Sequence, residues 1–144
     1  MIKREEYLKK IRPFMSKEIV KVLTGIRRCG KSVMLELIKE DLISQGIKKE
    51  NLFSVNFETG AVSYVKSLEE TYEVVKEFAA KRKEKIYLFF DEIQELPHWE
   101  KLINSIMIDF DADIYITGSN AKMLSGELAT YLGGRYVEFK IYPF

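Results

Sequence analysis

The segment at residues 25–32, GIRRCGKS, constrains the fold of this chain more than any other feature of its sequence. It fits the pattern GxxxxGK(S/T) at every fixed position. The β-branched residues 19–23 precede it and predict a buried strand, and apolar residues at helical spacing over 31–44 predict a helix after it. A strand, a glycine-bearing turn and a helix in this order are typical of a phosphate-binding loop.

Each fixed position of this loop requires its residue type for a separate chemical reason. Gly25 and Gly30 permit backbone conformations that bring amide groups against phosphate oxygens. Lys31 is long enough to neutralise the β- and γ-phosphates, and the Ser32 hydroxyl is a suitable oxygen ligand for Mg²⁺. The predicted nucleotide-binding residues of this segment are Gly25, Ile26, Arg27, Arg28, Cys29, Gly30, Lys31, Ser32 and Val33.

The variable positions of the loop leave alternatives open. Arg27 and Arg28 fit contact with phosphate or with a neighbouring subunit, and they fit a solvated surface equally well. Cys29 is the only cysteine, which excludes an intrachain disulfide, and we interpret it as an incidental loop residue.

A second candidate site feature is the acidic pair Asp91-Glu92, which follows the apolar segment 86–90. That segment is apolar on both faces, as expected for a strand in the middle of a parallel sheet. The carboxyl ends of such strands line the ligand crevice. We therefore predict that Asp91 holds Mg²⁺ together with Ser32, and that Glu92 orients and deprotonates an attacking water. The alternative is a solvated acidic turn, which the upstream phosphate loop disfavours.

The remaining segments alternate between strand and helix patterns. Residues 52–57, 114–116 and 136–142 predict strands, and helices are expected after the capping box Ser67–Glu70 and after Pro97. Alternation of this kind predicts an α/β fold, a three-layer α/β/α sandwich with a five-stranded parallel sheet. One complete strand–helix unit separates the loop helix from the Asp91 strand. This arrangement suits a sheet with a further strand inserted between the two nucleotide-binding strands, and it resembles P-loop NTPases of the additional-strand, catalytic-Glu type rather than small GTPases. The resemblance implies strand order 5-1-4-3-2, with segment 114–116 as the inserted strand.

Two further positions follow from this order. The end of the inserted strand brings Ser119 and Asn120 between the phosphate loop and Asp91, where a polar side chain could bind the γ-phosphate or the attacking water. A helix N-cap is the alternative role for either residue. Arg135 follows a glycine pair and fits an arginine finger that acts on the γ-phosphate of a neighbouring copy, which would require a homo-oligomer. A surface arginine at a helix end fits it nearly as well.

Length and composition narrow the remaining possibilities. The 144 residues predict one domain, and 47% hydrophobic with 31% charged residues excludes a disordered chain. We expect an N-terminal helix or arm over 1–18 and the core over 19–144. The net charge of +1 does not indicate a nucleic-acid surface. The sequence has neither a long apolar run nor a signal peptide, which predicts a cytoplasmic protein without a membrane partner.

Several of these motifs together resemble a known family, the prokaryotic AAA+-like P-loop ATPases of the AAA_14 type. The resemblance is carried by KVLTGIRRCGKS at 21–32, FFDEIQ at 89–94, TGSNAKMLS at 117–125 and LGGRYVE at 132–138, the last resembling the arginine segment of the family. It implies ATP as the nucleotide and an ATPase core followed by a lid and a C-terminal domain, often of the DUF4143 kind. The apolar end of the chain, directly after a strand, also predicts that the native protein continues.

Two functions of different classes compete on this sequence. The leading hypothesis is Mg²⁺-dependent binding and hydrolysis of ATP, coupled to parts of the protein outside these residues or to an unknown partner. The alternative is a nucleotide-gated interaction module with little or no turnover. A small-molecule kinase is a weaker third hypothesis, because no acceptor pocket is evident. A nucleic-acid partner is expected only for the full-length protein.

Overall fold

The sheet of this protein has five parallel strands. The structure, a computed structural model, describes residues 2–26, 30–58, 67–119, 128–130 and 132–143. The strands are β1 (Val20–Thr24), β2 (Leu52–Asn56), β3 (Ile86–Asp91), β4 (Ala112–Gly118) and β5 (Tyr136–Lys140). Their order is β2-β3-β4-β1-β5, and every neighbouring pair is parallel. The predicted order is confirmed, because β4 lies between β1 and β3.

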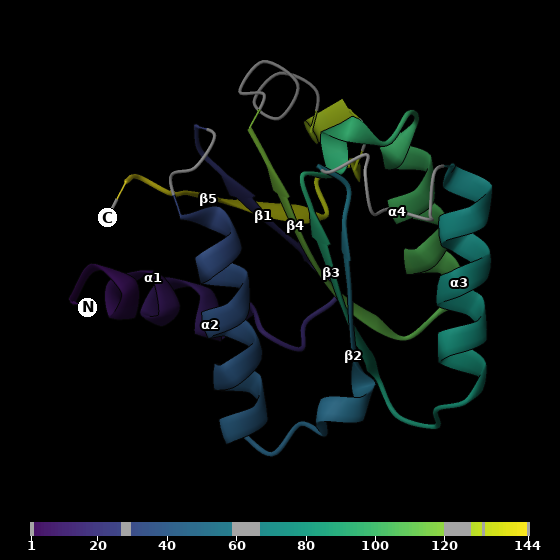
Figure 1. The fold of residues 1–144 in the computed structure, drawn as a ribbon, viewed down its shortest axis with the longest axis horizontal. Coiled ribbons are helices and arrows are strands. Elements are labelled where there is room, and N and C mark those ends of the chain that lie inside the picture. The colour runs from purple at the N-terminus through teal and green to yellow at the C-terminus, as the bar shows by residue number, and fades with distance from the viewer. Residues whose placement is uncertain (1, 27–29, 59–66, 120–127, 131, 144) are drawn as a thin grey trace.

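Helices cover both faces of this sheet and complete the predicted three-layer sandwich (Figure 1). Helices α1 (Ile2–Ile11) and α2 (Lys31–Ser44) lie on one side, and α3 (Leu68–Ala80) and α4 (Trp99–Asp109) lie on the other. Among the residues that the structure describes, three short 3-10 helices join the larger elements: η1 (Arg12–Phe14), η2 (Lys49–Asn51) and η3 (Ile93–Glu95). No helix in these described ranges is both long enough and apolar enough to cross a membrane.

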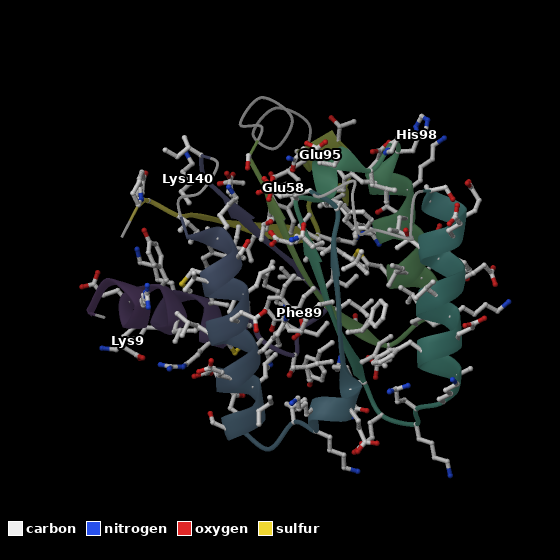
Figure 2. The ribbon with its side chains drawn as sticks, viewed as in Figure 1. Lys9, Glu58, Phe89, Glu95, His98 and Lys140 are labelled. Carbon is white, nitrogen blue, oxygen red and sulfur yellow. The ribbon has the colours of Figure 1, made fainter. Side chains whose placement is uncertain are left out.

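The two faces of the sheet form separate hydrophobic cores because side chains alternate along each strand. On the α3/α4 side, residues such as Val22, Phe90 and Ile116 pack against those helices. On the α1/α2 side, Phe89 stacks on Tyr115 with ring centroids 4.9 Å apart. Figure 2 shows Phe89 in the middle of the molecule. The three central strands are buried almost throughout, whereas β2 and β5 are partly exposed.

The ends of several elements differ from the sequence prediction. Strand β4 is longer than the predicted segment 114–116, because β1 and β3 hydrogen-bond to it on both sides. Strand β5 ends at Lys140 rather than at residue 142. Pro97 precedes α4 instead of lying in its first turn, since His98 is the residue before the helix. The predicted cap at Ser67 is present, and its hydroxyl accepts a hydrogen bond from the Glu70 amide at 3.1 Å.

The N-terminal arm packs onto the α2 side of the sandwich. Ile11 is fully buried in the core that α2 and the sheet share, and Phe14 meets Phe139 edge-on at 5.8 Å. The Arg12 guanidinium binds Asp41 of α2 at 2.8 Å and Glu5 of α1 at 2.6 Å. Apolar packing and a charged clamp therefore fasten the arm to the phosphate-loop helix.

A buried ionic cluster lies near the amino ends of β1 and β4. The Lys21 ammonium contacts the Asp113 carboxylate, and both side chains are fully buried. Asp113 also accepts hydrogen bonds from the Ser16 amide at 2.8 Å and from the Tyr115 hydroxyl at 2.6 Å. Burial lowers the pKa of Lys21, an effect that the attraction of Asp113 opposes, and burial next to Asp113 raises the pKa of Tyr115 far above its usual value.

Candidate nucleotide-binding site

The candidate site lies at the carboxyl edge of the three central strands. The register places Leu23 beside Thr117 and Thr24 beside Gly118 in β1 and β4. Phe90 of β3 pairs with Ile116 of β4, so the following residues of these two strands are also neighbours. In a parallel sheet all carboxyl ends meet at one edge, which brings the phosphate loop, the acidic pair and the end of β4 together.

Lys31 occupies the centre of this edge with only 3% of its surface exposed. It is the first residue of α2, directly after Gly30, whose φ of 108° is a backbone conformation that favours glycine. The Lys31 ammonium donates to the carbonyl oxygens of Gly25 and Ile26 and to the Ser119 hydroxyl, each at 2.9 Å. It also lies 3.6 Å from a carboxylate oxygen of Glu92. Lys31 thus links the phosphate loop to the ends of β3 and β4.

Ser32 and Asp91 form a pair of oxygen donors next to this lysine. The Ser32 hydroxyl donates to Asp91 Oδ2 at 2.6 Å. The other carboxylate oxygen of Asp91 accepts a hydrogen bond from the hydroxyl of Thr117, which is fully buried. A cavity of about 340 Å³ adjoins the pair, lined also by Glu36, Lys39 and Asn56.

Glu92 is held in a strained backbone conformation. Its φ of 54° and ψ of 53° are left-handed, which is uncommon outside glycine and is often found at functional sites. The backbone amide of Glu92 donates to the Thr117 hydroxyl at 2.9 Å. The carboxylate accepts from the Ser119 hydroxyl at 2.8 and 2.9 Å and from the Gln94 amide at 2.8 Å. The surrounding side chains thus fix both the backbone and the carboxylate.

Several predicted site residues come together at this edge, and others do not. Gly25, Gly30, Lys31, Ser32, Asp91, Glu92 and Ser119 lie together, as the contacts above show. Ile26 and Val33 flank them with exposed side chains. Arg27, Arg28, Cys29 and Asn120 lie outside the described residues.

Arg135 lies at the opposite edge of the sheet. It directly precedes β5, and its carbonyl accepts from the Val20 amide at the start of β1. Because the phosphate loop follows the other end of β1, the two are separated along this strand by roughly 13 Å, at ~3.3 Å per residue. The guanidinium is exposed and donates to Asn104 at 3.0 Å and to the Leu132 carbonyl at 3.2 Å. Arg135 therefore does not contact the site of its own chain.

Sequence reasoning missed two residues of the site, Thr117 and Gln94. Thr117 could have been identified from the strand pattern. It lies two positions after Tyr115, so its side chain is on the same face of the sheet, and it is the penultimate residue of the strand, close to the ligand edge. Gln94 had no such signal, because its position depends on the left-handed turn at Glu92.

The residues present fit a magnesium–nucleotide complex. Mg²⁺ is usually held by one or two protein oxygens together with water and phosphate oxygens, and Ser32 and Asp91 supply such oxygens side by side. The first amides of α2 have no partner within the helix, and with Lys31 they provide positive charge for phosphate. This donor set suits the β- and γ-phosphates of a nucleoside triphosphate.

Comparison with solved structures shows the same fold. A DNA polymerase III gamma-subunit-related protein from Thermotoga maritima aligns with a TM-score of 0.65 at 11% identity, covering 96% of this chain and 45% of that one. The ORC1 protein of Aeropyrum pernix, solved in complex with DNA, aligns with a TM-score of 0.62 at 20% identity, covering 98% and 45%.

Curated relatives share more of the sequence. An uncharacterized protein of Haemophilus influenzae is 46% identical over 143 residues, which is 99% of this chain and 36% of that protein. The uncharacterized protein MJ1544 of Methanocaldococcus jannaschii is 36% identical over 125 residues, covering 86% and 26%. The chain thus spans about a third or less of these relatives. Residues 17–144 match the family model of the AAA domain, AAA_14, and the chain belongs to this family.

Proposed function

We propose that this chain binds and hydrolyses ATP with Mg²⁺ as an AAA-type ATPase core. The observation that carries the proposal is the convergence of two functional pairs at one sheet edge. Ser32 and Asp91 are 2.6 Å apart, and Lys31 and Glu92 are 3.6 Å apart. A phosphate-binding lysine, two ligands for a cation and a carboxylate base are the groups that phosphoryl transfer to water requires.

In this proposal the phosphate loop positions the nucleotide. Lys31 and the first amides of α2 bind the β- and γ-phosphates, and Ser32 and Asp91 hold Mg²⁺, directly or through water. Bound there, the cation neutralises charge on the phosphate oxygens. Thr117 fixes the orientation of Asp91, because its hydroxyl donates to Oδ1 of the carboxylate while the Ser32 hydroxyl donates to Oδ2.

Glu92 is the proposed general base. Its carboxylate orients the attacking water and accepts one of the water protons. Ser119 is the proposed sensor, since its hydroxyl contacts both Lys31 and Glu92 and so connects the phosphate-binding side with the base. Asn120, which lies outside the described residues, keeps the roles predicted from the sequence: contact with the γ-phosphate or the attacking water, or a helix N-cap.

Arg135 is proposed to act as an arginine finger on the γ-phosphate bound by a neighbouring copy of the chain. Its exposed position at the amino edge of the sheet supports action on another chain. In that case specific activity rises with protein concentration and Arg135→Ala removes the rise. Activity that is independent of concentration would instead indicate a site that needs no neighbour.

The experiment that tests the proposed function measures phosphate release from Mg·ATP for the wild type and two variants. Glu92→Gln removes the base but keeps the size of the side chain, so we expect loss of turnover with ATP binding retained. Lys31→Ala should lose both binding and turnover. ATP binding by Lys31→Ala at wild-type affinity would refute the assigned site.

One observation favours a second function, a nucleotide-gated interaction module with little turnover. The Glu92 carboxylate already accepts hydrogen bonds from Ser119 and Gln94, which restrain it. If this arrangement persists with nucleotide bound, the domain would order a partner surface without hydrolysis. Equal, near-zero phosphate release by the wild type and Glu92→Gln, with intact ATP binding, would support this function. We propose a nucleic-acid partner, and a process driven by ATP hydrolysis, only for a full-length protein of the size of the curated relatives.

A further inference from the structure

We propose that Gln94 is a positioning residue that orients both the Glu92 carboxylate and the water that attacks the γ-phosphate. Its amide nitrogen holds the Glu92 carboxylate, and its amide oxygen accepts a hydrogen bond from the water that Glu92 deprotonates. This inference rests on the proposed ATPase function and adds a residue to which neither the motif pattern nor the family match assigns a role.

The first observation is the direction of the Gln94 amide. Gln94 Nε2 lies 2.8 Å from Glu92 Oε1 and 3.5 Å from Glu95 Oε2. An ionised carboxylate only accepts hydrogen bonds, so the NH₂ group faces Glu92, and the amide oxygen is the end of the amide that is left for a donor. The two carboxylates thus fix which end of the amide is which.

The second observation is the state of that oxygen. Gln94 Oε1 is buried and has no hydrogen-bond partner, the one such buried side-chain atom found among the described residues. Nearly all buried polar atoms in proteins are paired, and an unpaired acceptor is destabilising. An acceptor kept unpaired next to a proposed catalytic base indicates a place for a donor, and a water molecule bound beside Glu92 is such a donor.

The third observation is the rigidity of the segment that carries Gln94. The short helix η3 (Ile93–Glu95) follows the left-handed residue Glu92, and this turn folds Gln94 back over the Glu92 side chain. Ile93 and Leu96 on either side of Gln94 are buried in the core beneath α4. Figure 2 shows Glu95 at the edge where β3 ends. Gln94 is therefore held by packing as well as by its hydrogen bond.

Gln94 assists the attack of water on the γ-phosphate of ATP. The water oxygen forms a bond to the γ-phosphorus, the bond between that phosphorus and the β–γ bridging oxygen breaks, and its electron pair leaves with ADP. One water proton passes to the Glu92 carboxylate, and the other stays covalently bound to the oxygen and makes a hydrogen bond to Gln94 Oε1. With both hydrogens directed in this way, the oxygen lone pair faces the phosphorus.

The test compares Gln94→Leu with the wild type. The variant keeps much of the side-chain volume and removes both the donor and the acceptor, so we expect kcat to fall on the order of 10²-fold. The KM for ATP and the Kd for Mg·ATP should stay within about twofold, because the Gln94 amide donates to Glu92 and Glu95, which are not the proposed ligands of the phosphates or of Mg²⁺. Gln94→Asn, which shortens the side chain by one methylene, should lose kcat as well. A loss expressed in KM would overturn the proposal.

Gln45→Leu is the matched control. Gln45 lies at the far end of α2, and its amide donates to the Asp41 carboxylate at 2.7 Å, a bond as short as that between Gln94 and Glu92. Its removal should leave kcat unchanged. Thermal unfolding of each variant checks that the chain folds.

A double-variant cycle separates a positioning role from a merely structural one. If Gln94 acts only through Glu92 and its water, adding Gln94→Leu to Glu92→Gln should cause no further loss of kcat. Independent, multiplying losses would overturn the proposal.

Binding of transition-state analogues distinguishes failure of this inference from failure of the proposed function. Gln94→Leu should bind Mg·ADP with aluminium fluoride about 10-fold or more weakly than the wild type, and Mg·ADP with beryllium fluoride equally well. Equal binding of both by the two proteins would refute the role of Gln94 while the ATPase function stands. A wild type that neither releases phosphate nor binds the aluminium fluoride complex would refute the proposed function itself.

Discussion

Two buried lysines at opposite ends of β1 differ in the groups that neutralise them. Lys21, near the amino end, faces the Asp113 carboxylate and the Lys17 carbonyl beneath the N-terminal arm, and its side chain is fully buried. Lys31, just beyond the carboxyl end, donates to two loop carbonyls and a serine hydroxyl and lies 3.6 Å from Glu92. Both lysines are buried, so burial alone does not identify the functional one.

The difference lies in the partners. The Lys21 cluster is closed, because Asp113 also accepts from Ser16 and Tyr115, and these contacts join the arm to the sheet. The partners of Lys31 are mostly neutral oxygens at the ligand edge of the sheet, and an anion with more negative charge could replace them. We infer that Lys21 stabilises the fold and that Lys31 binds phosphate.

The largest expected effect is that of Lys31→Met on activity. We expect kcat/KM for Mg·ATP to fall about 10³-fold or more, because the phosphates lose their positive partner. The midpoint of thermal unfolding should fall less than for Asp113→Ala, because the Glu92 carboxylate keeps its hydrogen bonds from Ser119 and Gln94 when Lys31 is removed. Phosphate-release kinetics and a thermal melt measure the two effects. If Lys31→Met lowers the unfolding temperature but keeps its activity per folded molecule, Lys31 is a structural lysine and not a phosphate-binding one.

Asp113→Ala should have the opposite profile. Removing one partner of a buried ion pair leaves Lys21 as an uncompensated charge, which typically costs about 3–5 kcal/mol of unfolding free energy. ATP turnover per folded molecule should be retained, because Asp113 lies at the far edge from Glu92. Urea unfolding measures the loss.

A second variant sharpens this result. Adding Lys21→Met to Asp113→Ala removes the unpaired charge and should recover part of the lost stability. If the double variant is less stable than Asp113→Ala alone, Lys21 stabilises the fold without its partner, and the cluster has been misinterpreted.

Thr117→Val should combine a smaller loss of stability with a loss of turnover. The hydroxyl accepts from the Glu92 amide and donates to Asp91, and both bonds are buried. Leaving these groups unpaired costs about 1–3 kcal/mol. We expect kcat to fall roughly tenfold or more, since both acidic residues lose an orienting contact. Thr117→Ser restores the hydroxyl and should restore kcat, and no rescue would argue against this role.

The smallest effect is expected for the clamp between the arm and α2. Hydrogen bonds from Arg12 lower the pKa of Asp41 below its ordinary value, so ionised Asp41 stabilises the fold above about pH 4. That stability is lost as the pH falls through the lowered pKa. Because Arg12 is 38% exposed and screened by solvent, Asp41→Asn should cost less than about 1 kcal/mol at pH 7.

Unfolding in urea at several pH values tests this prediction. The gap in stability between the wild type and Asp41→Asn should narrow toward acid. A gap that stays constant with pH would show that the Asp41 carboxylate does not stabilise the fold through its charge.

Much of the fold was predictable from local pattern. The strand–loop–helix order around Lys31 and the doubly apolar segment before Asp91 depend on neighbours in sequence, and so does the cap at Ser67. The inserted position of β4 was predicted from the spacing of the motifs together with the resemblance to additional-strand ATPases, and the strand order confirms it.

The sequence by itself determined the class of fold, the phosphate loop and the acidic pair, because periodicity and fixed spacing are properties of nearby residues. Only the tertiary structure decided which polar groups meet across strands. It paired Lys21 with Asp113, placed Thr117 between Asp91 and Glu92, and turned Gln94 back onto Glu92. Strand register and a left-handed turn set these contacts, and both depend on how segments distant in sequence pack together.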